Sequence, residues 1–270
     1  MKLKDKVVVI TGSTRGIGKA IAKACAKEGA KIVISSRTES AVKQQCDILR
    51  RQGLSVSCIA ADVTKKGDIE KLFKHAIETW GRIDVWINNA GMSGGFRPLD
   101  ELSEEEIESI IDTNLTAVLH ACRLVIPYFN HKGGVLINLT GKGGRGDASP
   151  YMAAYAATKA AITNLTKSLA RENAAYPISI HAVSPGMVDT DLIKNSKRSP
   201  MLAEHAESIP YVLKAIGMPV DEAGKAFVDI VAQEPGKETG NIYSLVRGLR
   251  LMKGIALLMW YRRTGKIKEM

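Results

Sequence analysis

Long hydrophobic runs are missing from this sequence. No apolar stretch approaches the ~20 residues that a membrane-spanning helix needs. Residues 1–5 lead directly into a strand-like run, without the long apolar segment of a secretory signal. We therefore expect a cytoplasmic protein.

Cysteine is scarce as well. The four cysteines, Cys25, Cys46, Cys58 and Cys122, show neither the paired spacing of a disulfide framework nor the spacing of metal ligands. This pattern predicts buried free thiols in a reducing compartment, and no metal site.

Aromatic residues make up only 5% of the chain and do not interleave with basic residues in its body. This argues against nucleic-acid binding, although the net charge is +10. Most of that charge is local, because residues 245–270 hold seven basic side chains and one acidic one.

Short β-branched runs alternate with longer amphipathic segments along residues 1–243. Strand-like runs occupy residues 7–10, 31–35, 56–60, 83–88, 135–139 and 178–183, and helical segments lie between them. Ser103 and Glu106 form a capping box that opens a long helix. The alternation predicts an α/β fold, a doubly wound parallel sheet of the Rossmann type in a single domain. Residues 244–270 would form a basic C-terminal helical extension.

A glycine-rich turn follows the first strand. Its residues are Gly12, Ser13, Thr14, Arg15, Gly16, Ile17 and Gly18. Glycines between a strand and a helix allow close approach of a pyrophosphate to the helix N-terminus. The turn therefore predicts a dinucleotide site, and a merely tight turn is the alternative.

The second strand ends without the acidic residue that would hold the ribose of NAD. Arg37 stands there instead, and together with Arg15 it could clamp a 2′-phosphate. We therefore expect NADP, with NAD as a possible cofactor. Solvated arginines are the plainer alternative.

Tyr155 and Lys159 are four residues apart, so both can project from one face of a helix. A nearby ammonium favours the phenolate and would lower the pKa of the tyrosine. Taken alone this spacing is weak evidence, because the two residue types meet by chance in many helices.

The order of motifs resembles the short-chain dehydrogenase/reductase family over residues 5–243. The matching pieces are Thr11-Gly-x-x-x-Gly-x-Gly18, Asp62-Val63-Thr64, Asn88-Asn89-Ala90-Gly91, Asn114, Tyr155-x-x-x-Lys159 and Pro185-Gly186-x-x-x-Thr190. The resemblance implies an oxidoreductase that is often a homodimer or homotetramer, built through the helices that begin near Ser103 and Tyr151.

The resemblance also assigns roles to individual residues. It implies that Tyr155 exchanges the proton, that Lys159 lowers its pKa and holds the nicotinamide ribose, and that Asn114 holds a relay water. The implied cofactor contacts are Asp62 and Val63 at the adenine, Asn89, Ala90 and Gly91 at the sheet edge, and Pro185, Gly186, Val188 and Thr190 at the nicotinamide. Asn114 and Thr190 could instead be ordinary capping residues.

One departure from the family pattern concerns a serine about thirteen residues before the tyrosine. That position holds Lys142, and an alignment on the strand end places it at Gly141 instead. The Thr140 hydroxyl is the first candidate to replace the serine, and Ser149 is a weaker one. The loop from Gly141 to Pro150 then carries one inserted residue.

This insertion and residues 181–192 resemble the chlorophyll b reductase branch of the family, whose members reduce a formyl group on a large pigment with NADPH. A substrate loop is expected at residues 187–216. Its apolar residues are Met187, Leu192, Ile193, Met201, Leu202, Ile209, Tyr211 and Leu213, with Lys194, Lys197 and Arg198 between them. These residues suit a hydrophobic substrate with a negative group, or they are core contacts of two short helices.

Leu245, Leu249, Met252, Ala256 and Met259 recur at helical spacing in the basic tail. Residues 245–263 could lie on an anionic membrane surface or pack against the subunit or its neighbour.

The sequence thus predicts an NADP(H)-dependent oxidoreductase that moves a hydride between nicotinamide and the carbonyl or alcohol of a bulky hydrophobic substrate. The alternative is a catalytically idle, nucleotide-sensing module that docks to a membrane or partner through its tail.

Overall fold

The computed structural model describes residues 1–194, 196–202 and 207–267. The Lys194 side chain and the tail residues Lys268 and Glu269, which the sequence analysis counted as charged, lie outside this description.

Seven parallel strands form one sheet in the order β3-β2-β1-β4-β5-β6-β7. The strands are β1 (Val7–Ile10), β2 (Lys31–Ser36), β3 (Val56–Ala60), β4 (Val85–Asn88), β5 (Gly134–Leu139), β6 (Ile178–Ser184) and β7 (Ile242–Ser244). The order reverses between β1 and β4, which is where an open parallel sheet forms its ligand crevice.

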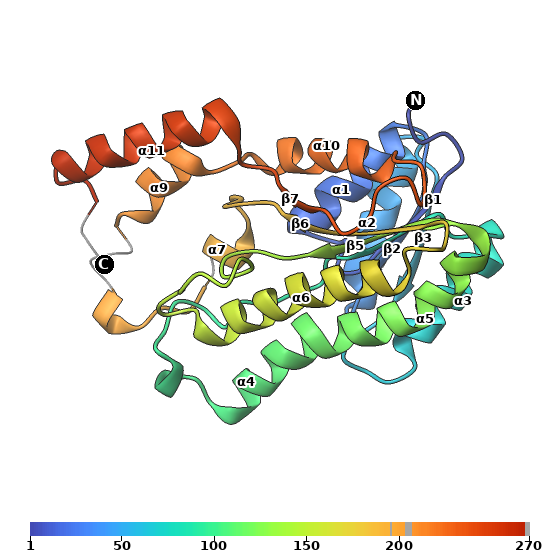
Figure 1. The fold of residues 1–270 in the computed structure, drawn as a ribbon, viewed down its shortest axis with the longest axis horizontal. Helices are drawn as coiled ribbons and strands as arrows, with labels where there is room; N and C mark the ends of the chain where they lie inside the picture. Colours follow the sequence, from blue (N-terminus) through green and yellow to red (C-terminus); the bar gives the residue numbers. More distant parts are fainter. Residues whose placement is uncertain (195, 203–206, 268–270) are drawn as a thin grey trace.

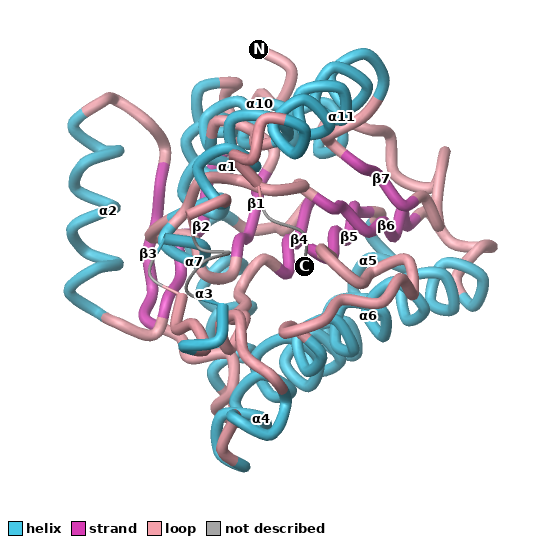
Figure 2. Tube along the Cα trace, turned by 90° about the vertical axis from the view of Figure 1, so that its left-hand side faces the viewer, coloured by secondary structure: helices cyan, strands magenta, loops and turns pink. Residues whose placement is uncertain are grey.

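Helices cover both faces of this sheet (Figures 1 and 2). One face carries α1 (Gly16–Lys27), α2 (Glu39–Arg51) and α10 (Val220–Val231), and the other carries α3 (Asp68–Trp80), α5 (Ala117–Lys132) and α6 (Ala153–Glu172). The shorter elements are η1 (Leu99–Glu101), α4 (Glu104–Ile111), α7 (Asp191–Lys194), η3 (Pro200–Leu202) and α9 (Ile209–Ile216). The doubly wound parallel sheet predicted from the sequence is confirmed.

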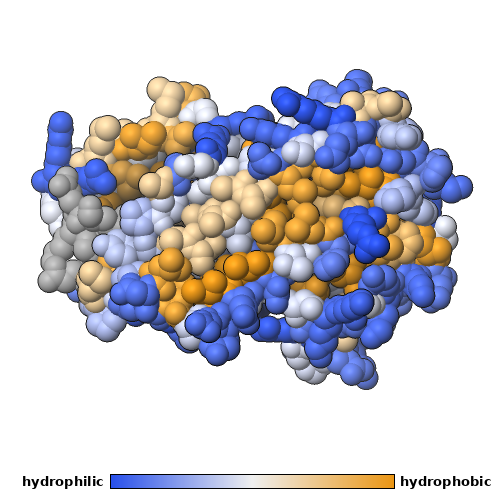
Figure 3. All heavy atoms as spheres, turned by 60° about the horizontal axis from the view of Figure 1, so that its bottom comes forward, coloured by the Kyte–Doolittle hydropathy of each residue, from blue (hydrophilic) through white to orange (hydrophobic). Residues whose placement is uncertain are grey.

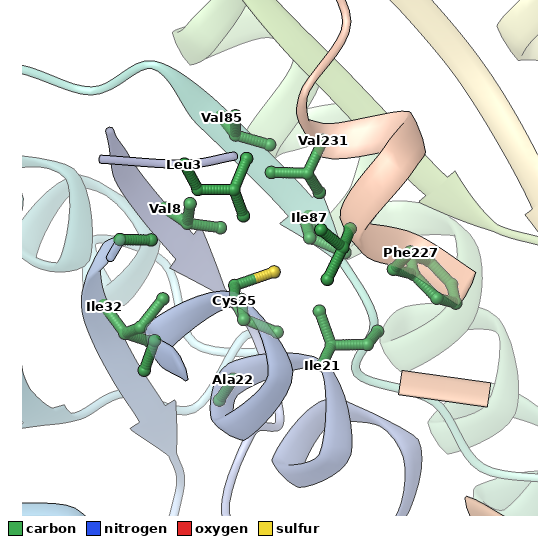
Figure 4. Close-up of a cluster of buried hydrophobic side chains, with 14 of the residues drawn as sticks. Leu3, Val8, Ile21, Ala22, Cys25, Ile32, Val85, Ile87, Phe227 and Val231 are labelled. Carbon is green, nitrogen blue, oxygen red and sulfur yellow. The ribbon is translucent and has the colours of Figure 1, made fainter. Parts of the chain in front are cut away.

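The apolar character of β1 follows from burial on both sides. Val8 and Ile10 pack in the core beneath α1 and α10, whereas Val9 packs in the core on the opposite face. Figure 4 shows the first of these cores, in which Cys25 and Phe227 meet the strand side chains. A strand covered on both faces has no need of alternating polar residues.

The long helix predicted from Ser103 is interrupted by a π-helical turn, η2 (Asp112–Thr116), between α4 and α5. Ser103 and Glu106 form the predicted capping box. In the described part of the chain, one continuous helix, Glu104–Lys132, has the length and composition of a membrane span, with a mean hydropathy of 1.2. It packs along the sheet as a core helix, and residues such as Val125 and Phe129 are fully buried there.

The prediction of four free thiols is wrong for two of them. Cys46 on α2 and Cys58 on β3 form a disulfide, with their Cα atoms 6.3 Å apart. The β2–α2–β3 crossover lays α2 over β3, so cysteines twelve residues apart meet across two layers. Cys25 and Cys122 remain free and buried, and burial raises the pKa of both thiols to about 12. The cysteines therefore no longer argue for a reducing compartment.

The C-terminal helix α11 (Gly248–Arg263) packs beside α9 at one end of the molecule and not on the sheet (Figure 1). Its packing face is formed by Gly254 and Tyr261, which are buried, with half-buried Leu257 and Leu258. Of the apolar seam predicted from the sequence, Leu249, Met252, Ala256 and Met259 lie on the other, exposed side of the helix. Leu245 precedes α11 and packs against the core of the sheet, so that part of the prediction is wrong.

Replacing both cysteines (Cys46→Ser with Cys58→Ser) is expected to lower the free energy of unfolding by about 3 kcal/mol, because the disulfide restricts the unfolded chain. Denaturant unfolding with and without a thiol reductant measures this. The reductant should destabilise the wild type and leave the double variant unchanged; a wild type indifferent to reductant would contradict the prediction.

Candidate active site

The glycine turn lies between β1 and α1, and a hydrogen-bond frame fixes its shape. The Ser13 hydroxyl donates to the Ile10 carbonyl at 2.8 Å, and the Ser13 amide donates to the Ser35 carbonyl at 2.9 Å. Gly12 and Gly16 have φ of +64° and +55°, in the left-handed region that favours glycine. The turn is therefore held open by its backbone, at the N-terminus of α1.

Gly18 allows a close approach to the strand beside it. A Cβ at Gly18 would lie 2.4 Å from the Asn89 amide nitrogen, and that nitrogen donates to the carbonyls of Thr11 and Gly12 at 2.8 and 3.0 Å. Asn89 thus ties the end of β4 to the turn after β1. This cradle, which a Cβ would fill, fits the pyrophosphate of a dinucleotide.

Thr11 is a positioning residue that the sequence analysis left out of the site. Its hydroxyl accepts the backbone N–H groups of Asn89 and Ala90, each at 3.0 Å. Ser35 was also missed; its buried hydroxyl donates to the Ile10 carbonyl at 3.2 Å. Both residues stand at strand ends, a place where hydroxyls commonly anchor turns.

The arginines assigned to a 2′-phosphate lie beside this turn. Arg15 is the residue before α1, and Arg37 follows the last residue of β2; both are exposed. Neither guanidinium makes a hydrogen bond or ion pair within the described residues. The residues that end and follow β2, Ser36, Arg37 and Thr38, carry no carboxylate, and the first acidic residue is Glu39 at the start of α2.

The predicted adenine residues follow β3. One Asp62 carboxylate oxygen accepts the Thr64 amide and hydroxyl at 3.1 and 2.8 Å, which closes a turn. Asp62 and Val63 are half-buried, as are Thr14 and Ile17 of the glycine turn.

Tyr155 and Lys159 share one face of α6 near the end of β5. The Lys159 ammonium donates to the Leu139 carbonyl at 2.9 Å and lies 5.5 Å from the centre of the Tyr155 ring. Lys159 is only 5% exposed, and burial lowers its pKa to about 8. A Cβ at Gly91 would lie 3.8 Å from this nitrogen, so the glycine leaves the approach from β4 open.

The pKa of Tyr155 differs from the sequence prediction. Burial raises it to about 12, whereas a nearby ammonium was expected to lower it. The cause of the rise is the loss of hydration, which disfavours the charged phenolate. The phenol is therefore neutral at pH 7 and carries a proton that it can donate.

Asn114 lies in the π-helical turn and is fully buried. Its amide exchanges two hydrogen bonds with the Met92 backbone, both 2.9 Å, and donates to the Thr158 hydroxyl at 3.1 Å. Thr158 in turn donates to the Tyr155 carbonyl at 2.7 Å. Asn114 therefore holds the loop after β4 against α6; its place in a proton relay stays a prediction. Thr158 was missed because nothing local marks it.

The Thr140 hydroxyl does not face Tyr155. It donates to the Lys159 carbonyl at 3.0 Å, lies 3.0 Å from the Thr163 hydroxyl, and belongs to a residue only 4% exposed. Its geometry is that of an anchor between β5 and α6, which leaves the predicted replacement of the serine without support. Ser149 donates to the Asp147 carbonyl at 3.3 Å, in the exposed loop.

At Gly141, the other position considered for the serine, a Cβ would lie 2.4 Å from the Tyr155 hydroxyl. The phenol thus occupies the space that a serine side chain would need. Lys142 points outward and pairs with Asp147 at 2.9 Å.

The residues predicted at the nicotinamide follow β6. Gly186 has φ +78°, and a Cβ there would lie 2.5 Å from Val246. Val188 is buried and bridges to Met218, and Pro185 is buried behind it. Thr190 lies 3.6 Å from the Cβ position of Gly16, which places it across the glycine turn.

The substrate loop is clamped to the loop after β4. Phe96 bridges to Arg198, and the Glu106 carboxylate pairs with Arg97 at 2.9 Å and with Lys197 at 2.8 Å. These donors hold the pKa of Glu106 at about 2. Two of the predicted rim cations are therefore engaged within the protein, because Arg198 also donates to the Ile193 carbonyl at 3.2 Å.

A glycine turn at the N-terminus of a helix, with a half-buried tyrosine beside a buried lysine at the same edge of a parallel sheet, is typical of a dinucleotide-binding protein of the oxidoreductase class. The chain belongs to the short chain dehydrogenase family, whose model matches residues 6–200. It is a family of oxidoreductases that act between carbonyl and alcohol groups.

One curated relative is a probable chlorophyll(ide) b reductase of rice, which is 36% identical over 250 residues. The match covers 83% of this chain and 50% of the relative, so the chain spans about half the length of that protein.

Two solved structures are similar over nearly their whole length. A 3-ketoacyl-(acyl-carrier-protein) reductase from Brucella melitensis in complex with NADH has a TM-score of 0.80 at 26% identity, covering 92% of this chain and 99% of that one. An actinorhodin polyketide ketoreductase with NADPH has a TM-score of 0.78 at 27% identity, covering 91% and 97%.

Gly141→Ser is expected to destabilise the protein by about 1–3 kcal/mol, because the new side chain and the Tyr155 hydroxyl compete for one space. Chemical denaturation measures the loss, and Lys142→Ser, at the exposed neighbouring position, should change stability by less than about 0.5 kcal/mol. A Gly141→Ser variant that is as stable as the wild type and oxidises NADPH faster with a carbonyl substrate would contradict this prediction. It would show that a serine fits beside Tyr155.

Proposed function

We propose that this protein is an NADP(H)-dependent reductase of a carbonyl group on a bulky hydrophobic substrate. The observation that carries the proposal is the neutral, partly buried Tyr155 phenol beside Lys159, at the sheet edge where the glycine turn ends. Bound NADPH would supply the hydride to the carbonyl carbon. The Tyr155 phenol donates its proton to the oxygen, so the carbonyl becomes an alcohol.

The protonation states of the pair support reduction over oxidation. A phenol with a pKa of about 12 is a ready donor only when an acceptor becomes strongly basic, as a carbonyl oxygen does on receiving hydride. Lys159, with a pKa of about 8, can return a proton near neutral pH. Asn114 positions α6 by donating a hydrogen bond to the Thr158 hydroxyl, which in turn donates to the Tyr155 carbonyl within the same helix.

Positive charge beside the glycine turn supports NADP over NAD. Arg15 and Arg37 are exposed beside the glycine turn, free of partners in the described part of the chain. A 2′-phosphate would give both guanidinium groups charge-assisted hydrogen bonds. The similar ketoreductase is described with NADPH, and the Brucella reductase with NADH.

The substrate class follows from the loop over the site. Leu192 and Met201 are 41% and 62% exposed there, and the side chains of Lys197 and Arg198 are taken up by protein contacts. An apolar body on the substrate would cover these side chains. The rice relative is named for a reductase of chlorophyll(ide) b, a large molecule of this kind.

A second candidate function has one observation in its favour. Thr140 donates its hydroxyl to the Lys159 carbonyl and Gly141 has no side chain, so neither of these two positions offers Tyr155 a second hydroxyl to polarise a carbonyl. A catalytically idle, nucleotide-sensing module would tolerate this. It would bind NADPH and oxidise none.

We also propose a homo-oligomer formed through the face that carries α5 and α6. Figure 3 shows an apolar band on this side of the molecule, and Leu119 on α5 is 44% exposed there. A second copy would cover the band. The cytoplasmic localisation expected from the sequence stays a prediction.

Tyr155→Phe is expected to reduce carbonyl-dependent NADPH oxidation by about a hundredfold or more, since it removes the proton donor. A panel of aldehydes, ketones and quinones supplies the carbonyl, and circular dichroism checks the fold. Tyr176→Phe, at an exposed phenol in the turn between α6 and β6, is the matched control and should keep full activity. If the wild type binds NADPH but oxidises none with any carbonyl of this panel, the result would favour the catalytically idle module.

Replacing Arg37 by alanine is expected to raise the Kd for NADPH about tenfold or more and to leave that for NADH unchanged, because only NADPH carries the 2′-phosphate. Fluorescence titration with both nucleotides gives the two constants. Arg51→Ala, at the exposed end of α2, should alter neither. An equal change for both nucleotides would remove Arg37 from the 2′-phosphate site.

A further inference from the structure

An apolar row on α11 faces solvent. Leu249, Met252, Met259 and Trp260 are 74%, 67%, 59% and 51% exposed, and Ile255 is 43% exposed. Large apolar side chains at three- and four-residue spacing usually face a core, whereas here they face outward. A contiguous exposed apolar patch of this kind marks an interaction surface.

The opposite side of α11 is fixed to α9. A Cβ at Gly254 would lie 2.7 Å from the Ala215 carbonyl oxygen, so the two helices approach closely. The Tyr211 and Tyr261 rings meet at 5.1 Å, and Arg250 donates to the Gly217 carbonyl at 2.9 Å. The contact with α9 occupies the packing face of α11. The helix would have to rotate and lose this contact before the outward row could be buried in the protein.

Positive charge surrounds the apolar row. Residues 245–267 contain no acidic side chain. Arg247, Lys253, Arg262 and Arg263 are exposed and make no hydrogen bond or ion pair through their side chains within the described residues. By helical geometry Lys253 and Arg262 lie on opposite flanks of the row, and Arg263 lies at its end. Trp260 has an amphipathic ring of the kind that sits at a membrane–water boundary.

We propose that this face of α11 docks on the surface of an anionic lipid bilayer. The apolar row would enter the headgroup region while the flanking cations pair with lipid phosphates and carboxylates. A second copy of this chain fits the surface poorly. A two-fold contact would place the patch against itself and bring the unpaired cations together.

Docking also sets the orientation of the protein. Because α9 is packed on α11 and belongs to the loop over the active site, the membrane would lie next to that loop. A hydrophobic substrate could then pass between the bilayer and the site. Vesicle binding itself does not require the proposed reductase activity, so the two proposals can fail separately.

Cosedimentation with vesicles of phosphatidylcholine alone, or with about a third phosphatidylserine, tests the proposal. The wild type should bind the anionic vesicles more tightly, and added salt should weaken the binding. Met252→Glu with Met259→Glu should reduce binding on the order of tenfold. Lys253→Glu with Arg262→Glu should reduce it by at least as much, on anionic vesicles only.

Matched controls place the same changes elsewhere. Ile48→Glu, on an exposed apolar position of α2, and Lys74→Glu, on the exposed side of α3, should bind vesicles as the wild type does. Every variant should keep the circular dichroism spectrum of the wild type, which shows that it is folded. The proposal would be overturned if the wild type did not bind anionic vesicles. It would also be overturned if the Met252/Met259 and Lys253/Arg262 variants bound them as tightly as the wild type does. Conversion of a larger assembly into a smaller one by the Met252/Met259 pair, without vesicle binding, would assign the face to a second copy.

Discussion

Burial of the Lys159 ammonium is the constraint around which the site is built. An ammonium at 5% exposure loses its hydration. Among the described residues, only the Leu139 carbonyl accepts a hydrogen bond from it. Desolvation is the sole cause of the fall in its pKa to about 8, since no described carboxylate offsets it. The same burial keeps the neighbouring phenol protonated. Burial of Lys159 thus gives it a pKa at which it can exchange a proton near neutral pH. Because Gly91 has no side chain, the Lys159 ammonium can be approached from the crevice.

The missing serine follows from the same geometry. Tyr155 reaches so close to Gly141 that any Cβ there would touch its hydroxyl, and Thr140 is committed to the backbone of α6. The phenol is therefore the group left to meet a substrate oxygen. One donor in place of two provides less stabilisation of the developing charge. The Glu106 carboxylate on α4 pairs with Lys197 of the substrate loop and with Arg97 of the loop after β4, and so ties the two loops together beside the site.

The sequence predicted what depends on local pattern. Buried β-branched runs located six strands, the Ser103–Glu106 box located the start of α4, and the glycine turn appeared directly after β1. What it missed depends on contacts between distant segments. Cys46 and Cys58 meet only because α2 crosses over β3; Thr11 matters because Asn89 folds back onto it. The pKa of Tyr155 was predicted in the wrong direction because spacing reveals the nearby lysine and says nothing of burial.

The tail shows why an apolar period alone cannot tell the inner side of a helix from the outer one. Leucines, methionines and isoleucine occur all round α11, so two rows were available for packing. The close contact at Gly254 decides between them, since only a residue without a side chain lets α11 lie against the Ala215 backbone. Tyr261, two turns further along, lies on the same face, and Met252 and Met259 are left on the other. Hydration of those side chains is unfavourable and contributes nothing to folding, which is the reason for proposing a contact outside the chain; the cationic rim, in a segment without acidic residues, favours an anionic surface for that proposed contact.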